Sequence, residues 1–194
     1  MRDAHLLLPR RRYHRLYNYD YSATGAYFVT VCTHGRACLF GHVEGDRVVL
    51  NDAGSIVRVE FETTPAIRPC VRLDSLVVMP NHVHAIICLE DSRETTAGAG
   101  CPGAGFIRPC SASLGSVIGM VKASCTRKIR TRQLPGPAVM WQKGYYEHVI
   151  RDYRSLEQIR QYIADNPAQW ALDRENPEYV PPENPPSGAE QWMV

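Results

Sequence analysis

A long apolar run at residues 77–89 contains two histidines one residue apart, and it constrains the fold more than any other part of the chain. A Met-Pro-Asn sequence interrupts the run, so we expect two strands, 72–78 and 83–89, with a short turn between them. His82 and His84, at the start of the second strand, would project from the same face, because side chains alternate along a strand. Two such imidazoles can bind a metal ion, but the pattern also fits two hydrogen-bonded histidines on a partly hydrated face.

The rest of the chain alternates between strand and helix signals. Gly45 lies at the centre of a predicted hairpin, and Asn51 or Asp52 can cap the helix that follows it. The predicted strands are 26–33, 38–43, 47–50 and 139–150, and the predicted helices run from about 51 to 63, from 113 to 130 and from 155 to 166.

A chain of 194 residues is within the range of one domain. We expect a basic, tyrosine-rich arm at 1–22, a folded domain at 23–172 with a flexible loop at 91–110, and an acidic, proline-rich tail at 173–194. Its seven cysteines are odd in number and form no Cys-x-x-Cys pair, which favours a reducing cytoplasm. No apolar stretch reaches membrane-spanning length, so we expect a soluble, cytoplasmic protein.

The net charge is only +2, but the basic and acidic residues are unevenly distributed along the chain. No acidic residue occurs between 95 and 146, and the N-terminal arm places arginines among tyrosines. Cations beside aromatic rings are typical of nucleic-acid surfaces, although a solvated tail and a solvated helix face would produce the same pattern. The candidate DNA-binding residues are Arg10, Arg11, Arg12, Arg15, Lys122, Arg127, Lys128 and Arg130.

The last predicted helix carries a second candidate group. Ser155 or Asp152 can cap its start, and Pro167 disfavours helical geometry at Asn166, so the helix should end there. Tyr162 and Asn166 are one turn apart and share a flank. A phenol and an amide oxygen could therefore face the sheet together.

Three motifs in order identify a resemblance to a known family. They are residues 79–84 (Met-Pro-Asn-His-Val-His), 141–151 (Trp-Gln-Lys-Gly-Tyr-Tyr-Glu-His-Val-Ile-Arg) and 159–167 (Ile-Arg-Gln-Tyr-Ile-Ala-Asp-Asn-Pro). With these motifs the chain resembles the single-tyrosine HUH transposases, and more narrowly the REP-associated tyrosine transposases, over roughly residues 10–177.

The resemblance implies an α/β (α+β) fold, in which helices flank an antiparallel sheet of ferredoxin-like or RRM-like type with the histidines on its central strand. It implies a divalent metal, Mg²⁺ or Mn²⁺, bound by His82, His84 and Asn166, with Tyr162 as the nucleophile. Two imidazoles and an amide oxygen would also accept zinc. The implied partner is single-stranded or hairpin DNA near the bacterial nucleoid, with no membrane; a homodimer or a monomer is compatible with this.

The implied reaction is cleavage and rejoining of single-stranded DNA at REP-like hairpins through a 5′-phosphotyrosine intermediate. Tyr145 and Tyr146 also lie in a family-like motif, but neither has an amide four residues later that could complete a metal site. Two alternatives remain at this stage: a transposase-derived nucleic-acid-binding protein without catalysis, and a metal-dependent hydrolase that uses the same two histidines.

Overall fold

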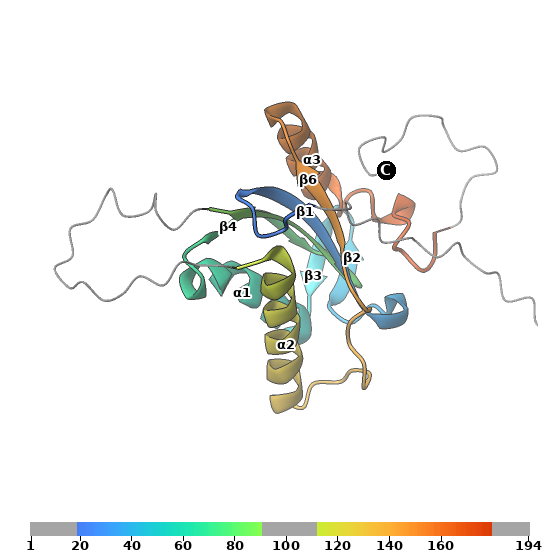
Figure 1. The fold of residues 1–194 in the computed structure, drawn as a ribbon. Helices are drawn as coiled ribbons and strands as arrows, with labels where there is room; N and C mark the ends of the chain where they lie inside the picture. The colour runs from blue at the N-terminus through green and yellow to red at the C-terminus, as the bar shows by residue number, and fades with distance from the viewer. Residues whose placement is uncertain (1–18, 91–111, 180–194) are drawn as a thin grey trace, which may run out of the picture.

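The computed structural model describes residues 19–90 and 112–179, and its centre is a four-stranded antiparallel sheet (Figure 1). The strand order is β4-β5-β1-β6, so β5 and β1 are central. The four strands are β1 (Gly25–Cys32), β4 (Val71–Val78), β5 (His82–Leu89) and β6 (Tyr146–Ile150). A separate hairpin consists of β2 (Gly41–Glu44) and β3 (Arg47–Leu50).

Within the described residues, three α-helices and two short 3₁₀ helices accompany the sheet. They are α1 (Asp52–Ile67), α2 (Leu114–Thr131), α3 (Tyr153–Asp165), η1 (His34–Arg36) and η2 (Trp170–Leu172). Without the β2–β3 hairpin and α3, the order is strand, helix, strand, strand, helix, strand. That order and the sheet topology are those of the ferredoxin-like fold, so the expected fold class is confirmed.

The two faces of the sheet bury different elements (Figure 1). Val83, Ala85 and Ile87 of β5 belong to a large apolar cluster with α1 and α2. Ile86 of β5 faces the opposite way and packs in a smaller cluster with residues of α3. The alternation of side chains along β5 therefore places α1 and α2 on one face and α3 on the other.

Local sequence explains where the helices begin. The side chain of Asn51 accepts a hydrogen bond from the backbone N–H of Gly54, and that of Ser113 accepts one from Ser116. Gly45 has φ of 60°, which the tight turn between β2 and β3 requires.

Several predicted boundaries are wrong, and the strand predicted at 38–43 begins only at Gly41. Helix α1 continues past Pro65 to Ile67, because a proline in the last turn removes only one intrahelical hydrogen bond. The strand predicted at 139–150 is shorter, because the backbone carbonyls of Gln142 and Gly144 bind the Lys122 ammonium instead of a neighbouring strand. Helix α3 begins at Tyr153, two residues before the predicted start, because the cap is Asp152, the second of the two caps that the sequence left open.

Some expectations concern other parts of the chain. The arginines at 10–15 and the loop at 91–110 lie outside the described residues.

Cys70 is disulfide-bonded, which differs from the expectation of reduced cysteines. Within 19–90 and 112–179, no helix has the length and apolar character needed to cross a membrane.

Candidate active site

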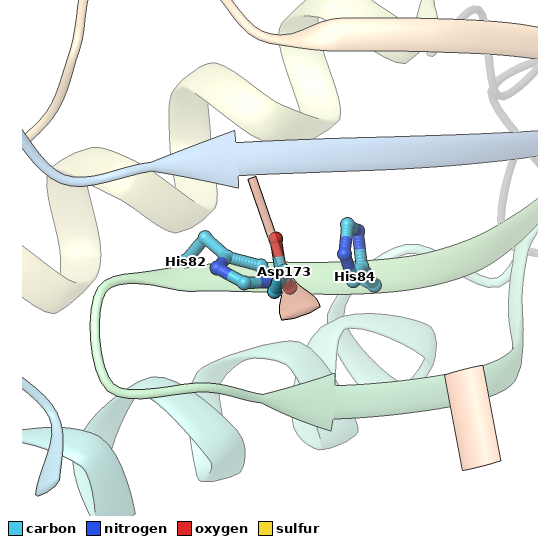
Figure 2. Close-up of side chains that lie close together, drawn as sticks. All are labelled: His82, His84 and Asp173. Atoms are coloured by element: carbon cyan, nitrogen blue, oxygen red, sulfur yellow. The ribbon is translucent and has the colours of Figure 1, made fainter. Parts of the chain in front are cut away.

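The two histidines lie at the start of central strand β5 (Figure 2). They are on the face that α3 covers. Both are buried, with exposed fractions of 0% for His82 and 2% for His84. Their ring centroids are 4.4 Å apart. Across the sheet, Cys32 and Thr30 of β1 stand opposite them in the antiparallel register. The same-face placement expected from the His-x-His spacing is thus present.

Each imidazole has a buried polar neighbour at its Nδ1 atom. Nδ1 of His82 lies 2.9 Å from the side-chain oxygen of Asn81, and Nδ1 of His84 lies 2.9 Å from the hydroxyl of Thr30. Such hydrogen bonds offset part of the cost of burying an imidazole and fix the direction of the ring. The sequence did not predict that either neighbour belongs to the site. Asn81 is part of the Met-Pro-Asn-His motif, and Thr30 lies on the predicted first strand, where it pairs with His84.

Helix α3 brings Tyr162 and Asn166 to the histidines. The Tyr162 hydroxyl is 3.4 Å from Nε2 of His84, and the two rings have centroids 5.3 Å apart. Asn166 follows the last residue of α3 and is 3% exposed. Its side-chain oxygen accepts no hydrogen bond from any described residue, which makes it a buried polar atom that can bind a ligand.

Asp173 completes this group and was missed by sequence reasoning, which placed it in the C-terminal tail. Nε2 of His82 and a carboxylate oxygen of Asp173 are 3.6 Å apart. Ligand atoms of His82, His84 and Asp173 all lie within 4.8 Å of one another (Figure 2). The residues after α3 carry no periodic pattern, so no sequence signal located this carboxylate. The segment from 173 to 176 is part of the folded unit, since Glu175 and Asn176 are also buried.

A cleft between the sheet and the segment that follows α3 is lined by several of these groups, among them His84, Tyr162 and Asp173. Tyr146 of β6 contributes to its wall, whereas Tyr145 packs into the apolar cluster on the opposite face. The side chains around the cleft include Thr30, His84, Tyr146, Tyr162, Asn166, Asp173, Arg174 and Glu175. Of the two competing tyrosines in the 145–146 pair, only Tyr146 therefore reaches this cleft.

An ion-pair network attaches α3 to edge strand β4. Arg160 donates to both carboxylate oxygens of Asp74, at 2.7 and 2.6 Å, and also pairs with Glu157. Arg72 donates to the same Asp74 at 3.0 Å. These two guanidinium groups lower the pKa of Asp74 to about 2, with Arg160 the larger cause. Arg160 lies two residues before Tyr162 on α3. The ion pair between Arg160 and Asp74 therefore helps to fix the position of Tyr162 relative to the sheet.

The cations predicted on α2 are not at the cleft, because α2 covers the opposite face of the sheet. Lys122 donates to two backbone carbonyls, and burial lowers its pKa. Lys128 pairs with Glu60, and Arg130 donates to the carbonyl of Ala138 at 2.6 Å. Arg127 donates to the Ser124 hydroxyl at 3.3 Å. Helical periodicity identified a basic surface, but it could not show that these cations serve contacts within the protein.

The donor atoms suit a divalent metal ion. Two imidazole nitrogens with carboxylate and amide oxygens form a mixed nitrogen and oxygen set, which Mn²⁺, Mg²⁺ and Zn²⁺ accept. The buried oxygen of Asn166 and the convergence of His82, His84 and Asp173 are the observations that fit such an ion. The residues present therefore could hold one.

Comparison with known proteins agrees with the fold. No family model matches the chain. A Haemophilus influenzae protein described as uncharacterised is 36% identical over 170 residues, which cover 86% of this chain and 93% of that protein. Among solved structures, a REP-associated tyrosine transposase bound to a REP hairpin is similar with a TM-score of 0.52 and 21% identity, over 82% of this chain and 74% of the other. The resemblance inferred from the motifs is confirmed at the level of the fold.

Proposed function

We propose that this chain, which belongs to the same family as the Haemophilus influenzae protein and has the fold of a REP-associated tyrosine transposase, is a metal-dependent endonuclease and strand transferase for single-stranded DNA. The observation that carries the proposal is the position of the Tyr162 hydroxyl, 3.4 Å from Nε2 of His84 in the cleft that Asn166 and Asp173 also line. A tyrosine nucleophile beside a candidate metal site is what phosphoryl transfer to a protein hydroxyl needs.

His82 and His84 are the proposed nitrogen ligands, and Asn166 and Asp173 supply the oxygen ligands. The proposed metal is Mg²⁺ or Mn²⁺, because an amide and a carboxylate oxygen suit hard cations. A bound divalent ion would withdraw charge from a non-bridging oxygen of the target phosphodiester. The charge on Asp173 also offsets the charge of the ion inside a buried site.

The covalent step is carried by Tyr162. Its hydroxyl oxygen attacks the phosphorus and forms a bond to the 5′ phosphate, while the bond from phosphorus to the 3′ oxygen breaks. The leaving oxygen keeps the electron pair and takes up a proton, which balances the proton lost by the phenol. The products are a 5′-phosphotyrosine and a free 3′ hydroxyl. A second 3′ hydroxyl can reverse the step on another strand, so rejoining needs no nucleotide cofactor.

The proposed substrate is a single strand that carries a hairpin. The solved neighbour is described as bound to a REP hairpin, and the same type of substrate is the natural proposal for this chain. Arg174 at the cleft can contact a phosphate beside the scissile bond. The arginines at 10, 11, 12 and 15 are proposed to add contacts to the hairpin or its flank.

Identification of the covalently modified tyrosine tests the proposal. The protein is incubated with Mn²⁺ and a labelled hairpin oligonucleotide, and the adduct is digested and mapped by mass spectrometry. We expect phosphotyrosine at Tyr162. Tyr162→Phe removes one oxygen and keeps the ring, so it should fold and bind DNA but form no adduct.

Tyr146→Phe is the matched control, because Tyr146 lines the same cleft from β6. It should slow adduct formation at most, and Tyr145→Phe on the other face should change it less. Phosphotyrosine found at 145 or 146 would contradict the assignment of the nucleophile. Binding to hairpins without any adduct in Mn²⁺ would instead support the alternative, a nucleic-acid-binding protein without catalysis.

A further inference from the structure

Asn81, the residue before the first histidine, occupies an unusual position in the site. It is fully buried at the turn between β4 and β5. Its side-chain nitrogen donates to two backbone carbonyls, that of Glu175 at 2.6 Å and that of Arg36 at 3.1 Å. One amide group therefore connects the histidine strand with two segments that are distant in the sequence.

Those two carbonyls determine which way the amide faces. A backbone carbonyl can only accept a hydrogen bond, so the atom of Asn81 that faces Glu175 and Arg36 must be the NH₂ group. The side-chain oxygen then faces Nδ1 of His82, at 2.9 Å. An amide oxygen can only accept, and Nδ1 of His82 must donate. The oxygen and nitrogen of a side-chain amide are often hard to tell apart, but the partners of Asn81 allow only this assignment.

The proton position at His82 follows. A neutral imidazole that carries its proton on Nδ1 has its lone pair on Nε2, and Nε2 is the atom on the Asp173 side, 3.6 Å from a carboxylate oxygen. Thr30 cannot do the same for His84, because a hydroxyl both donates and accepts. The two histidines are thus oriented by different means.

We propose that Asn81 is a positioning residue for the metal site: it keeps His82 in the tautomer that presents the Nε2 lone pair, and it anchors the segment that brings Asp173 to the same point. Both effects come from one side chain, since Glu175 is two residues from Asp173. The inference rests on the proposed function only in that the site is used for a metal. The tautomer itself can be measured without metal or DNA.

The first test is nuclear magnetic resonance of the metal-free wild-type protein with ¹⁵N-labelled histidine. Long-range ¹H–¹⁵N correlations should show His82 with a protonated Nδ1 and an unprotonated Nε2. Asn81→Asp keeps an acceptor for the Nδ1 proton and should keep this tautomer, although it loses the two hydrogen bonds to the carbonyls of Glu175 and Arg36. Asn81→Ala should lose the preference. A neutral His82 that carries its proton on Nε2 and none on Nδ1 in the wild type would overturn the inference without any need for a variant.

The second test is the affinity for Mn²⁺, measured by calorimetry on the folded proteins. Loss of a group that orients a metal-binding histidine typically costs about 10- to 100-fold in affinity, and we expect a weakening of that size for Asn81→Ala. Asn176→Ala is the matched control. Asn176 is a buried asparagine in the same C-terminal segment whose amide donates to the Trp170 carbonyl, and its removal should leave the affinity unchanged.

The outcomes separate this inference from the proposed function. A folded Asn81→Ala protein with wild-type affinity and the wild-type tautomer would overturn the positioning role. If Asn81→Ala does not fold, the wild-type and Asn81→Asp spectra still decide the tautomer. A wild-type protein that shows the expected tautomer and binds Mn²⁺, but forms no adduct with DNA, would contradict the proposed function and leave the role of Asn81 intact.

Discussion

The sheet face under α1 and α2 is filled with aliphatic and aromatic side chains, whereas the face under α3 combines a small apolar cluster with buried histidine, threonine and asparagine. Both faces use the same strands, because alternate residues of β5 supply one face or the other. On the first face, burial of apolar surface stabilises the fold. On the second, α3 buries only Ile159 and Ile163, with Leu156 and Tyr162 partly buried beside them, and the ion pair of Arg160 with Asp74 adds a polar contact.

This difference suggests a division of roles within one sheet. The α1–α2 face should determine whether the chain folds, and the α3 face should determine whether it reacts. Substitutions on the two faces should therefore affect different measurements.

Loss of both histidines should have the largest effect on the reaction. The variant His82→Ala with His84→Ala lacks both proposed nitrogen ligands, so Mn²⁺ binding and DNA cleavage should fall below detection. The protein should remain folded by circular dichroism, because the cluster under α1 and α2 is untouched. Cleavage by this variant in the presence of EDTA would show that the assigned metal site is wrong.

A cavity on the opposite face should have the largest effect on stability. Leu114 of α2 is fully buried there, and Leu114→Ala should lower the free energy of unfolding by about 2–5 kcal/mol. Once corrected for the folded fraction, its rate of adduct formation should match the wild type. Val59→Ala is the control, since Val59 on α1 is 45% exposed, and it should change the stability by at most about 0.5 kcal/mol.

If Leu114→Ala reduced the adduct rate of the folded protein as strongly as a change near Tyr162, the two faces would not be independent. Both quantities can be obtained from one preparation, by urea denaturation and by adduct formation below the unfolding transition.

The sequence predicted the fold and much of the site for identifiable physical reasons. Strand alternation placed His82 and His84 on one face, and helical spacing with a terminal proline placed Tyr162 and Asn166 on one flank. These are local rules, and they depend only on the element to which each residue belongs.

What the sequence could not predict depends on contacts between distant segments. Asp173 reaches the histidines because the segment after α3 folds back onto the sheet. Glu175 anchors this segment: its backbone carbonyl accepts a hydrogen bond from Asn81, and its carboxylate pairs with Arg36 at 3.2 Å. No periodic pattern in the sequence predicts that this segment folds back. In the same way, the basic pattern of α2 could not reveal that Glu60 and nearby backbone carbonyls bind its cations.

The ion pair between Asp74 and Arg160 should have an intermediate effect on both measurements. The Asp74 pKa of about 2 lies below the value of about 3.9 for an unfolded chain, which corresponds to about 1–2 kcal/mol after allowance for the partly exposed Arg160. A lowered carboxyl pKa contributes stability above the unfolded value, and this contribution disappears as the pH falls toward 2. Asp74→Asn should remove this part of the acid dependence and should slow the reaction of Tyr162.

Asp46→Asn is the control for that measurement, because Asp46 and Arg47 form a pair on the exposed hairpin at 3.8 Å. The free energy of unfolding of Asp46→Asn should change with pH between 6 and 2 in the same way as that of the wild type. An Asp74→Asn protein with unchanged acid dependence and an unchanged adduct rate would show that α3 does not depend on this pair.

The smallest expected effect concerns DNA binding, where the two faces can be compared through single cations. Each phosphate contact to single-stranded DNA contributes about 0.7 to the slope of log affinity against log salt concentration. Replacement of Arg174, which lines the cleft, by Ala should reduce the slope by about that amount, because we propose that the strand passes through this cleft. Arg127→Ala on α2 should leave the slope unchanged, because α2 covers the other face and Arg127 contacts Ser124 there. Fluorescence anisotropy with a labelled hairpin at several salt concentrations measures both slopes. A reduction by Arg127→Ala but not by Arg174→Ala would place the DNA on the α2 surface, as the charge pattern of the sequence first suggested, and would separate the binding face from the reacting one.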